Sequence, residues 1–121
     1  MAKREILIVD DNPNMASLLS EMLDVFDLRS RITTDGESAL ELIQREDFAL
    51  VITDLKMPKM SGTELLTAIK GRRPNLPVVV ISGYNVASAE GQVVEGLASG
   101  FIHKPFKMTD IQSVVERFCS I

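Results

Sequence analysis

The feature that most constrains the fold is an alternation of short apolar runs with segments of helical spacing. The apolar runs cover residues 5–10, 28–33, 48–54, 76–82 and 100–104. Between them, apolar residues recur at the intervals of amphipathic helices, as in Met15, Leu18, Leu19, Met22 and Phe26. Strands that alternate with helices predict an α/β fold, in which a parallel sheet is covered by helices on both faces.

Local signals support five strands and five helices. Asn12 before Pro13 is typical of an N-cap followed by proline at the first helical position. Thr34 with Glu37, and Ser61 with Glu64, have the spacing of capping boxes. The strands at 5–10, 48–54 and 76–82 are the most continuously apolar, so we expect them at the centre of the sheet. The strand at 28–33 is the most polar, and we expect it at an edge.

Length and composition indicate one compact domain over residues 1–121. No apolar run approaches the length of a membrane span or of a signal peptide, so we expect a soluble, cytoplasmic protein without a membrane partner. The single cysteine, Cys119, fits a reducing compartment. The formal net charge of −4 argues against direct binding of nucleic acid by this domain.

Polar side chains stand at the carboxyl ends of four predicted strands. Asp10 and Asp11 follow the first strand, Asp54 ends the third, Ser82 ends the fourth and Lys104 ends the fifth. In an open parallel sheet these ends lie along one edge, which is where ligands bind. We therefore expect three carboxylates, one hydroxyl and one ammonium group to meet there.

Three neighbouring carboxylates repel one another unless a proton or a cation joins them. Oxygen ligands at a solvated edge suit Mg²⁺, and no histidine or thiol is placed to favour zinc. Carboxylate-bound Mg²⁺ serves phosphate chemistry, and a carboxylate is itself a nucleophile that forms aspartyl phosphates. The pattern predicts phosphoryl chemistry at this edge.

The segments "ILIVDDN", "VITDLKMPKMSG", "VVVISGY" and "GFIHKPF" occur in this order. Together they resemble the receiver domains of bacterial two-component response regulators, and the resemblance covers essentially the whole chain. It implies a flavodoxin-like sheet of five parallel strands in the order 2-1-3-4-5, with five helices on both faces.

The resemblance also implies roles for individual residues. Asp54 accepts a phosphoryl group from a phosphohistidine of a sensor kinase. Mg²⁺ is bound by Asp11, Asp54 and the backbone carbonyl of Lys56, and by Asp10 mainly through water. Lys104 and Ser82 contact the phosphoryl group, and Ser82 and Phe101 form the switch. The peptide bond before Pro105 is expected to be cis.

The implied function is that of a signalling domain, not an enzyme, which assists its own phosphorylation and dephosphorylation. The implied partner is a sensor histidine kinase or a phosphotransfer protein, recognised through the first helix and the loop after the fifth strand. Phosphorylation is expected to switch the surface of the fourth helix (85–98), the fifth strand and the fifth helix. A homodimer through that surface, and an output domain in a longer parent chain, remain open.

Two other functions remain as alternatives. One is an unphosphorylated docking scaffold, against which the complete set of Asp10, Asp11, Asp54, Ser82 and Lys104 argues. The other is a Mg²⁺-dependent phosphohydrolase with an aspartate nucleophile. Haloacid-dehalogenase-like enzymes have a second aspartate two residues after the first, and here that residue is Lys56.

Each candidate also has a structural explanation when it is taken alone. Asp10 and Asp11 fit a region that precedes a helix, and Ser82 fits a helix cap. Lys104 with Pro105 fits the start of a loop, and an aromatic residue such as Phe101 is common in a packed strand. His103 is expected to be half-exposed and receives no role.

Overall fold

The structure is a computed structural model, and it describes residues 5–54, 60, 62–82 and 96–119. Five parallel strands form one sheet in the order β2-β1-β3-β4-β5. The strands are β1 (Glu5–Val9), β2 (Arg29–Thr33), β3 (Leu50–Asp54), β4 (Val78–Ser82) and β5 (Gly100–His103). The predicted strand order is confirmed, with β1, β3 and β4 at the centre and the polar β2 at an edge.

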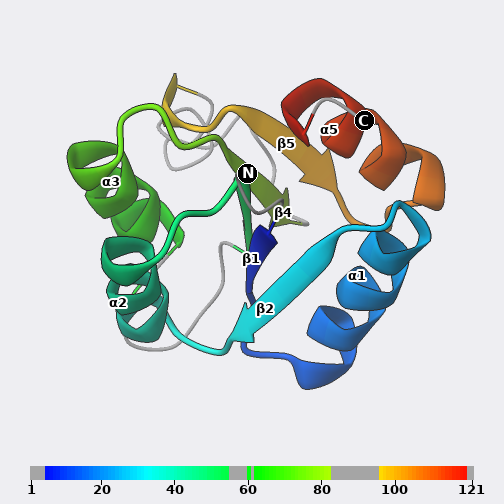
Figure 1. Cartoon of the computed structure of the whole chain (residues 1–121), viewed down its shortest axis with the longest axis horizontal. Helices are drawn as coiled ribbons and strands as arrows, with labels where there is room; N and C mark the ends of the chain where they lie inside the picture. The colour runs from blue at the N-terminus through cyan, green and yellow to red at the C-terminus, as the bar shows by residue number, and fades with distance from the viewer. Residues whose placement is uncertain (1–4, 55–59, 61, 83–95, 120–121) are drawn as a thin grey trace.

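Four helices of the described residues cover the sheet: α1 (Pro13–Val25), α2 (Gly36–Arg45), α3 (Gly62–Arg72) and α5 (Met108–Cys119). Helices α1 and α5 lie on one face of the sheet, and α2 and α3 lie on the other (Figure 1). The helix that we expect at 85–98 falls largely on residues 83–95, outside the described residues. No helix of the described residues is long and apolar enough to cross a membrane.

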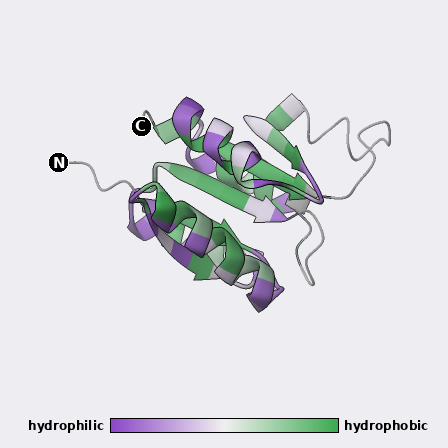
Figure 2. Cartoon of the chain, turned by 90° about the vertical axis from the view of Figure 1, so that its right-hand side faces the viewer, coloured by the Kyte–Doolittle hydropathy of each residue, from purple (hydrophilic) through white to green (hydrophobic). Residues whose placement is uncertain are grey.

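Two apolar cores lie on the two faces of the sheet. Alternation along β1 sends Ile6 and Ile8 to the core beneath α1 and α5, and Leu7 and Val9 to the core beneath α2 and α3. This is why β1 is apolar without interruption, since a strand covered on both faces has no solvent side. Figure 2 shows the hydrophobic strands between the mixed surfaces of the helices.

The start of α1 is as predicted. The Asn12 side chain accepts hydrogen bonds from the backbone N–H groups of Asn14 and Met15, and Pro13 is the first helical residue. The apolar stripe is partly wrong, because Leu18 is 43% exposed. Leu19 is buried as predicted, and Met15, Met22 and Phe26 pack against the core, but the stripe omits the buried Ala16 and Leu23. The buried face of α1 is therefore centred slightly away from Leu18, toward Ala16 and Leu23.

The start of α2 differs from its prediction by one residue. Asp35, not Thr34, is the N-cap, and its Oδ1 accepts a hydrogen bond from the backbone N–H of Ser38 at 2.8 Å. Aspartate is at least as good an N-cap as threonine. Asp35 is therefore the N-cap residue, in place of the predicted Thr34. The corresponding signal at Ser61 lies outside the described residues.

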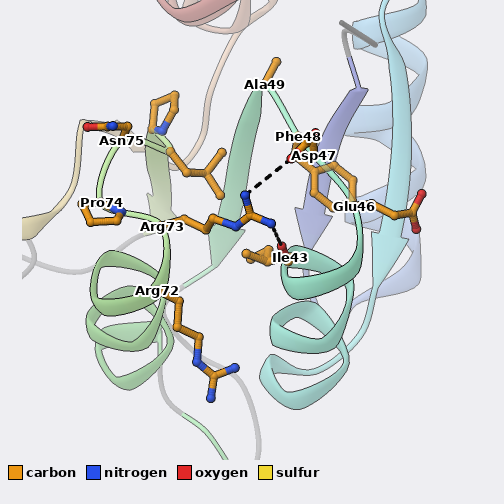
Figure 3. A pocket seen from close by; sticks show the side chains of 11 residues that line it. Ile43, Glu46, Asp47, Phe48, Ala49, Arg72, Arg73, Pro74 and Asn75 are labelled. Carbon is orange, nitrogen blue, oxygen red and sulfur yellow. Dashed lines mark hydrogen bonds and ion pairs between the residues drawn. The ribbon is translucent and has the colours of Figure 1, made fainter.

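Arg73 connects the carboxyl ends of the two helices on one face, far along the chain from each other. Its guanidinium donates to the carbonyl of Ile43 at 3.1 Å and lies 3.5 Å from the carboxylate of Asp47. Figure 3 shows this side chain reaching across a pocket of about 410 Å³ that Phe48 and Leu76 also line. The pocket lies at the loops that precede β3 and β4, at the opposite edge of the sheet from Asp10 and Asp54.

Candidate functional site

Three carboxylates meet at the carboxyl edge of the sheet. Asp10 follows β1, Asp54 is the last residue of β3, and Asp11 lies at the entry to α1. One carboxylate oxygen from each lies within 4.8 Å of the others. Asp10 is 3% exposed and Asp54 is 9% exposed, whereas Asp11 is exposed. The fold therefore brings together the three acidic residues that the strand ends predicted.

Asp10 is fixed by the backbone on both sides. Its N–H donates to the carbonyl of Thr33 at 3.0 Å, and its Oδ1 accepts from the N–H of Asn12 at 2.9 Å. Burial raises the pKa of Asp10, and the charge of Asp54 raises it further, while the Asn12 hydrogen bond and Lys104 act in the opposite direction. A nearby cation would relieve this cost of charging.

Asp54 is paired with Lys104. The Nζ of Lys104 donates to Oδ2 of Asp54 at 2.8 Å, and the lysine side chain is 31% exposed against 10% for the aspartate. The Oγ1 of Thr53 donates to the backbone carbonyl of Asp54 at 3.0 Å, within the buried sheet. The acidic residue at the centre of the site is thus held by a rigid strand and neutralised by one cation.

The other predicted residues are on β4, on β5 and directly after β5, with one outside the described residues. Ser82 ends β4, and its Cα pairs with that of His103 across the sheet. Phe101 is partly buried and packs against the core beneath α2 and α3. The Lys104–Pro105 peptide bond is cis. Lys56 lies outside the described residues.

Two features near the site have no signal in the sequence. Thr33 supplies the carbonyl that holds Asp10, and a β-strand neighbour of this kind is set by register and not by a motif. Met60, in the connection between β3 and α3, packs over Gly36, where a Cβ would lie 2.6 Å from the Met60 sulfur. The glycine at the first position of α2 thus allows the Met60 side chain to approach closely.

A second pocket opens beside Lys104. It has a volume of about 420 Å³ and is lined by Met15, Leu18, Lys104, Pro105 and Phe106. Apart from the lysine, its lining is apolar, and the exposed Leu18 belongs to it. The residue that was misplaced in the apolar stripe therefore forms part of a surface next to the acidic cluster.

Comparison with known proteins identifies the family. The model of the response regulator receiver domain matches residues 6–116. The response regulator protein PilR of Pseudomonas aeruginosa is 33% identical over 115 residues, which are 95% of this chain and 26% of that protein. The chain thus spans about a quarter of the length of this curated relative.

Solved structures agree on the fold. The receiver domain of NtrX from Brucella abortus superposes with a TM-score of 0.86 at 33% identity, and the match covers 95% of this chain and 98% of that one. The receiver domain of the sensor histidine kinase PA1611 from Pseudomonas aeruginosa PAO1 has a TM-score of 0.88 at 22% identity, covers 99% of this chain and 100% of that one, and holds a magnesium ion in its active site cleft. The chain belongs to the response regulator receiver domains of two-component signal transduction.

Proposed function

We propose that this domain receives a phosphoryl group on Asp54 from the phosphohistidine of a sensor kinase or phosphotransfer protein. The observation that carries the proposal is the meeting of Asp10, Asp11 and Asp54 within 4.8 Å, beside an ammonium group 2.8 Å from Asp54. An oxygen of Asp54 attacks phosphorus, the bond from phosphorus to the histidine nitrogen breaks, and the imidazole leaves. The product is an aspartyl phosphate.

Each neighbour of Asp54 has a task in this transfer. β3 presents the carboxylate from a rigid buried strand, which reduces the entropy lost in aligning it with the donor. Lys104 stabilises the negative charge on the transferring group. Before the transfer, its ammonium group donates a hydrogen bond to the carboxylate of Asp54. Ser82 at the end of β4 is proposed to donate a hydrogen bond to a phosphoryl oxygen.

The residues of the site fit a magnesium ion. Asp11 and Asp54 would bind it directly, together with the backbone carbonyl of Lys56, and Asp10 would act mainly through water. Two observations support the fit. The carboxylates offer only oxygen ligands, which Mg²⁺ prefers. Burial raises the pKa of Asp10, and a bound cation would favour the charged form of this carboxylate. When bound, the ion supplies positive charge against the phosphoryl oxygens.

The pocket beside Lys104 supports the docking of the phosphoryl donor. Leu18 is 43% exposed on α1, and Pro105 and Phe106 belong to the loop after β5. An apolar surface next to a catalytic edge suits a partner that must place its histidine close to Asp54. This is the surface of the first helix and the loop after the fifth strand that the family resemblance implies.

The proposed output is a change of the surface formed by the fourth helix, which we expect at 85–98, by β5 and by α5. Phe101, on β5, is the proposed aromatic member of the switch, and Ser82 is its hydroxyl partner. A homodimer through this surface and an output domain in a longer parent chain are compatible with this reading. In PilR the matched region is 26% of the whole protein, which leaves room there for other domains.

The test is mass spectrometry of the protein after incubation with acetyl phosphate, with and without Mg²⁺, beside the Asp54→Asn variant. We expect a Mg²⁺-dependent gain of one phosphoryl group that the variant does not show. Asp11→Asn serves as a second variant that keeps Asp54 and weakens the proposed metal site. Absence of labelling with acetyl phosphate, and again with phosphorylated kinase as donor, would contradict the proposal.

A further inference from the structure

A third pocket lies between β5 and α5, apart from the acidic cluster. Its volume is about 420 Å³, and its lining includes Phe101 and His103 from β5 and Asp110, Arg117 and Phe118 from α5. Phe101 thus has one side on the core beneath α2 and α3 and another on a surface pocket. The sequence reasoning gave no role to His103, the other ring in this pocket from the same strand.

The rings of Phe101 and His103 are in contact. Their centroids are 4.7 Å apart, and the ring planes are inclined at 53°. Two residues apart on one strand, the side chains point to the same face of the sheet. A tilted pair at this distance is in the favourable range for aromatic rings. His103 is itself exposed, so the contact needs no burial of the imidazole.

The backbone of His103 adds a second relation. In the parallel pairing of β4 with β5, the Cα of Phe101 is opposite that of Val80, and the Cα of His103 is opposite that of Ser82. His103 is therefore next to both proposed switch residues. Its ring contacts that of Phe101, and its Cα is paired with that of Ser82. No other residue of the described β5 has both relations.

We propose that His103 is a positioning residue of the switch, whose ring holds Phe101 in its partly exposed orientation. For its functional meaning this inference rests on the proposed switch role of Phe101. A rotation of Phe101 away from His103 breaks the ring contact, so the contact favours the orientation of Phe101 described here over any other rotamer. Phosphorylation can change the rotamer of Phe101 only if it favours another rotamer by more free energy than the contact with His103 supplies.

The test measures the side-chain orientation of Phe101 by NMR in the unphosphorylated protein, with ring-labelled phenylalanine and assignment through a Phe101→Leu variant. Three-bond couplings give the χ1 populations. In His103→Ala we expect the ratio of the resting rotamer to the others to fall by about 2- to 10-fold, which is the equilibrium value of one aromatic contact. His103→Phe keeps a ring at this position and should retain the resting ratio.

Arg117→Ala is the matched control, because Arg117 lines the same pocket and its guanidinium lies 5.1 Å from the ring centroid of Phe118, not of Phe101. An unchanged Phe101 ratio in His103→Ala, or an equal change in Arg117→Ala, would overturn the proposal. Labelling of Asp54 by acetyl phosphate is measured on the same samples. Its failure in the unsubstituted protein would count against the proposed function alone, because the rotamer measurement needs no phosphoryl group.

Discussion

Lys104 reaches from the end of β5 to the end of β3, where its Nζ lies 2.8 Å from Oδ2 of Asp54. The pair joins two strands that are not neighbours in the sheet, because β4 lies between them. The lysine thus places an ammonium group beside three crowded carboxylates. It therefore has a structural task in the resting protein besides its proposed task in phosphoryl transfer.

Substitution of Lys104 by methionine should reveal both tasks. Without Mg²⁺ we expect a loss of about 1–3 kcal/mol in the free energy of unfolding, because a largely buried carboxylate loses its charged partner. Saturating Mg²⁺ should remove much of that loss by neutralising the same carboxylates. Urea denaturation with and without Mg²⁺ measures it. An equal loss in Lys104→Met whether or not Asp54 is also replaced by asparagine would show that the ion pair is not the cause.

Asp10→Asn should change how stability depends on pH. Burial raises the pKa of Asp10 in the folded protein above its ordinary value of 3.8, so the folded state holds this proton more tightly than the unfolded chain does. The resulting stabilisation is complete below that ordinary value and is lost as the pH rises through the higher folded pKa. At neutral pH without metal, the neutral Asp10→Asn variant should therefore be more stable than the unsubstituted protein.

The same variant should gain less stability from Mg²⁺, because it lacks one of the three carboxylates. Thermal unfolding at neutral and at acidic pH, each with and without Mg²⁺, measures both effects. Asp24→Asn, in the exposed part of α1, is the control for a simple change of net charge. A variant that is less stable than the unsubstituted protein at neutral pH without metal would contradict the prediction.

Gly36→Ala should destabilise the protein although it improves helix propensity. The new Cβ would lie 2.6 Å from the Met60 sulfur and 3.2 Å from two Met60 carbons, which forces the Met60 side chain to shift. Overpacking of this kind costs about 1–3 kcal/mol, against a propensity gain of about 1 kcal/mol or less. A double-mutant cycle with Met60→Ala measures the coupling, and strict additivity of the two substitutions would refute the contact as the cause.

Arg73→Ala should lower the free energy of unfolding by about 1 kcal/mol, because the carbonyl of Ile43 loses its donor at the end of α2. Asp47→Ala should change it by less than about 0.5 kcal/mol, since the Asp47 side chain is 93% exposed and the ion pair is long at 3.5 Å. Urea denaturation of the two variants and their double variant measures both. A larger effect for Asp47→Ala would reverse the assigned order of the two contacts.

Leu18→Ser should separate docking from chemistry. Leu18 is 43% exposed, so the substitution should lower the free energy of unfolding by only about 1 kcal/mol and leave the fold intact. The rate of phosphorylation by a kinase should fall about 10-fold or more if Leu18 anchors the donor, while the rate with acetyl phosphate stays the same. Val25→Ser, at the other exposed apolar position of α1, is the control. An equal slowing with both donors would place the effect in the site and not in docking.

The sheet and the acidic cluster were predictable because their signals are local or topological. Continuous apolar runs marked β1, β3 and β4 as central, and the rule that parallel strand ends share an edge brought Asp10 to Asp54. Leu18 was misplaced because helical spacing fixes a face only to within part of a turn. The approach of Met60 to Gly36 and the contact of His103 with Phe101 depend on backbone paths and side-chain rotamers, which no spacing rule encodes.

The way the site is assembled makes it a reporter of strand order in the sheet. The carboxylates and the lysine come from the ends of β1, β3 and β5, so the site is spread along the chain from Asp10 to Lys104. A backbone cut in any loop between β1 and β5 therefore leaves part of the site on each fragment. Recovery of Asp54 labelling after two such fragments are mixed would report that the parallel sheet has reassembled in its native strand order.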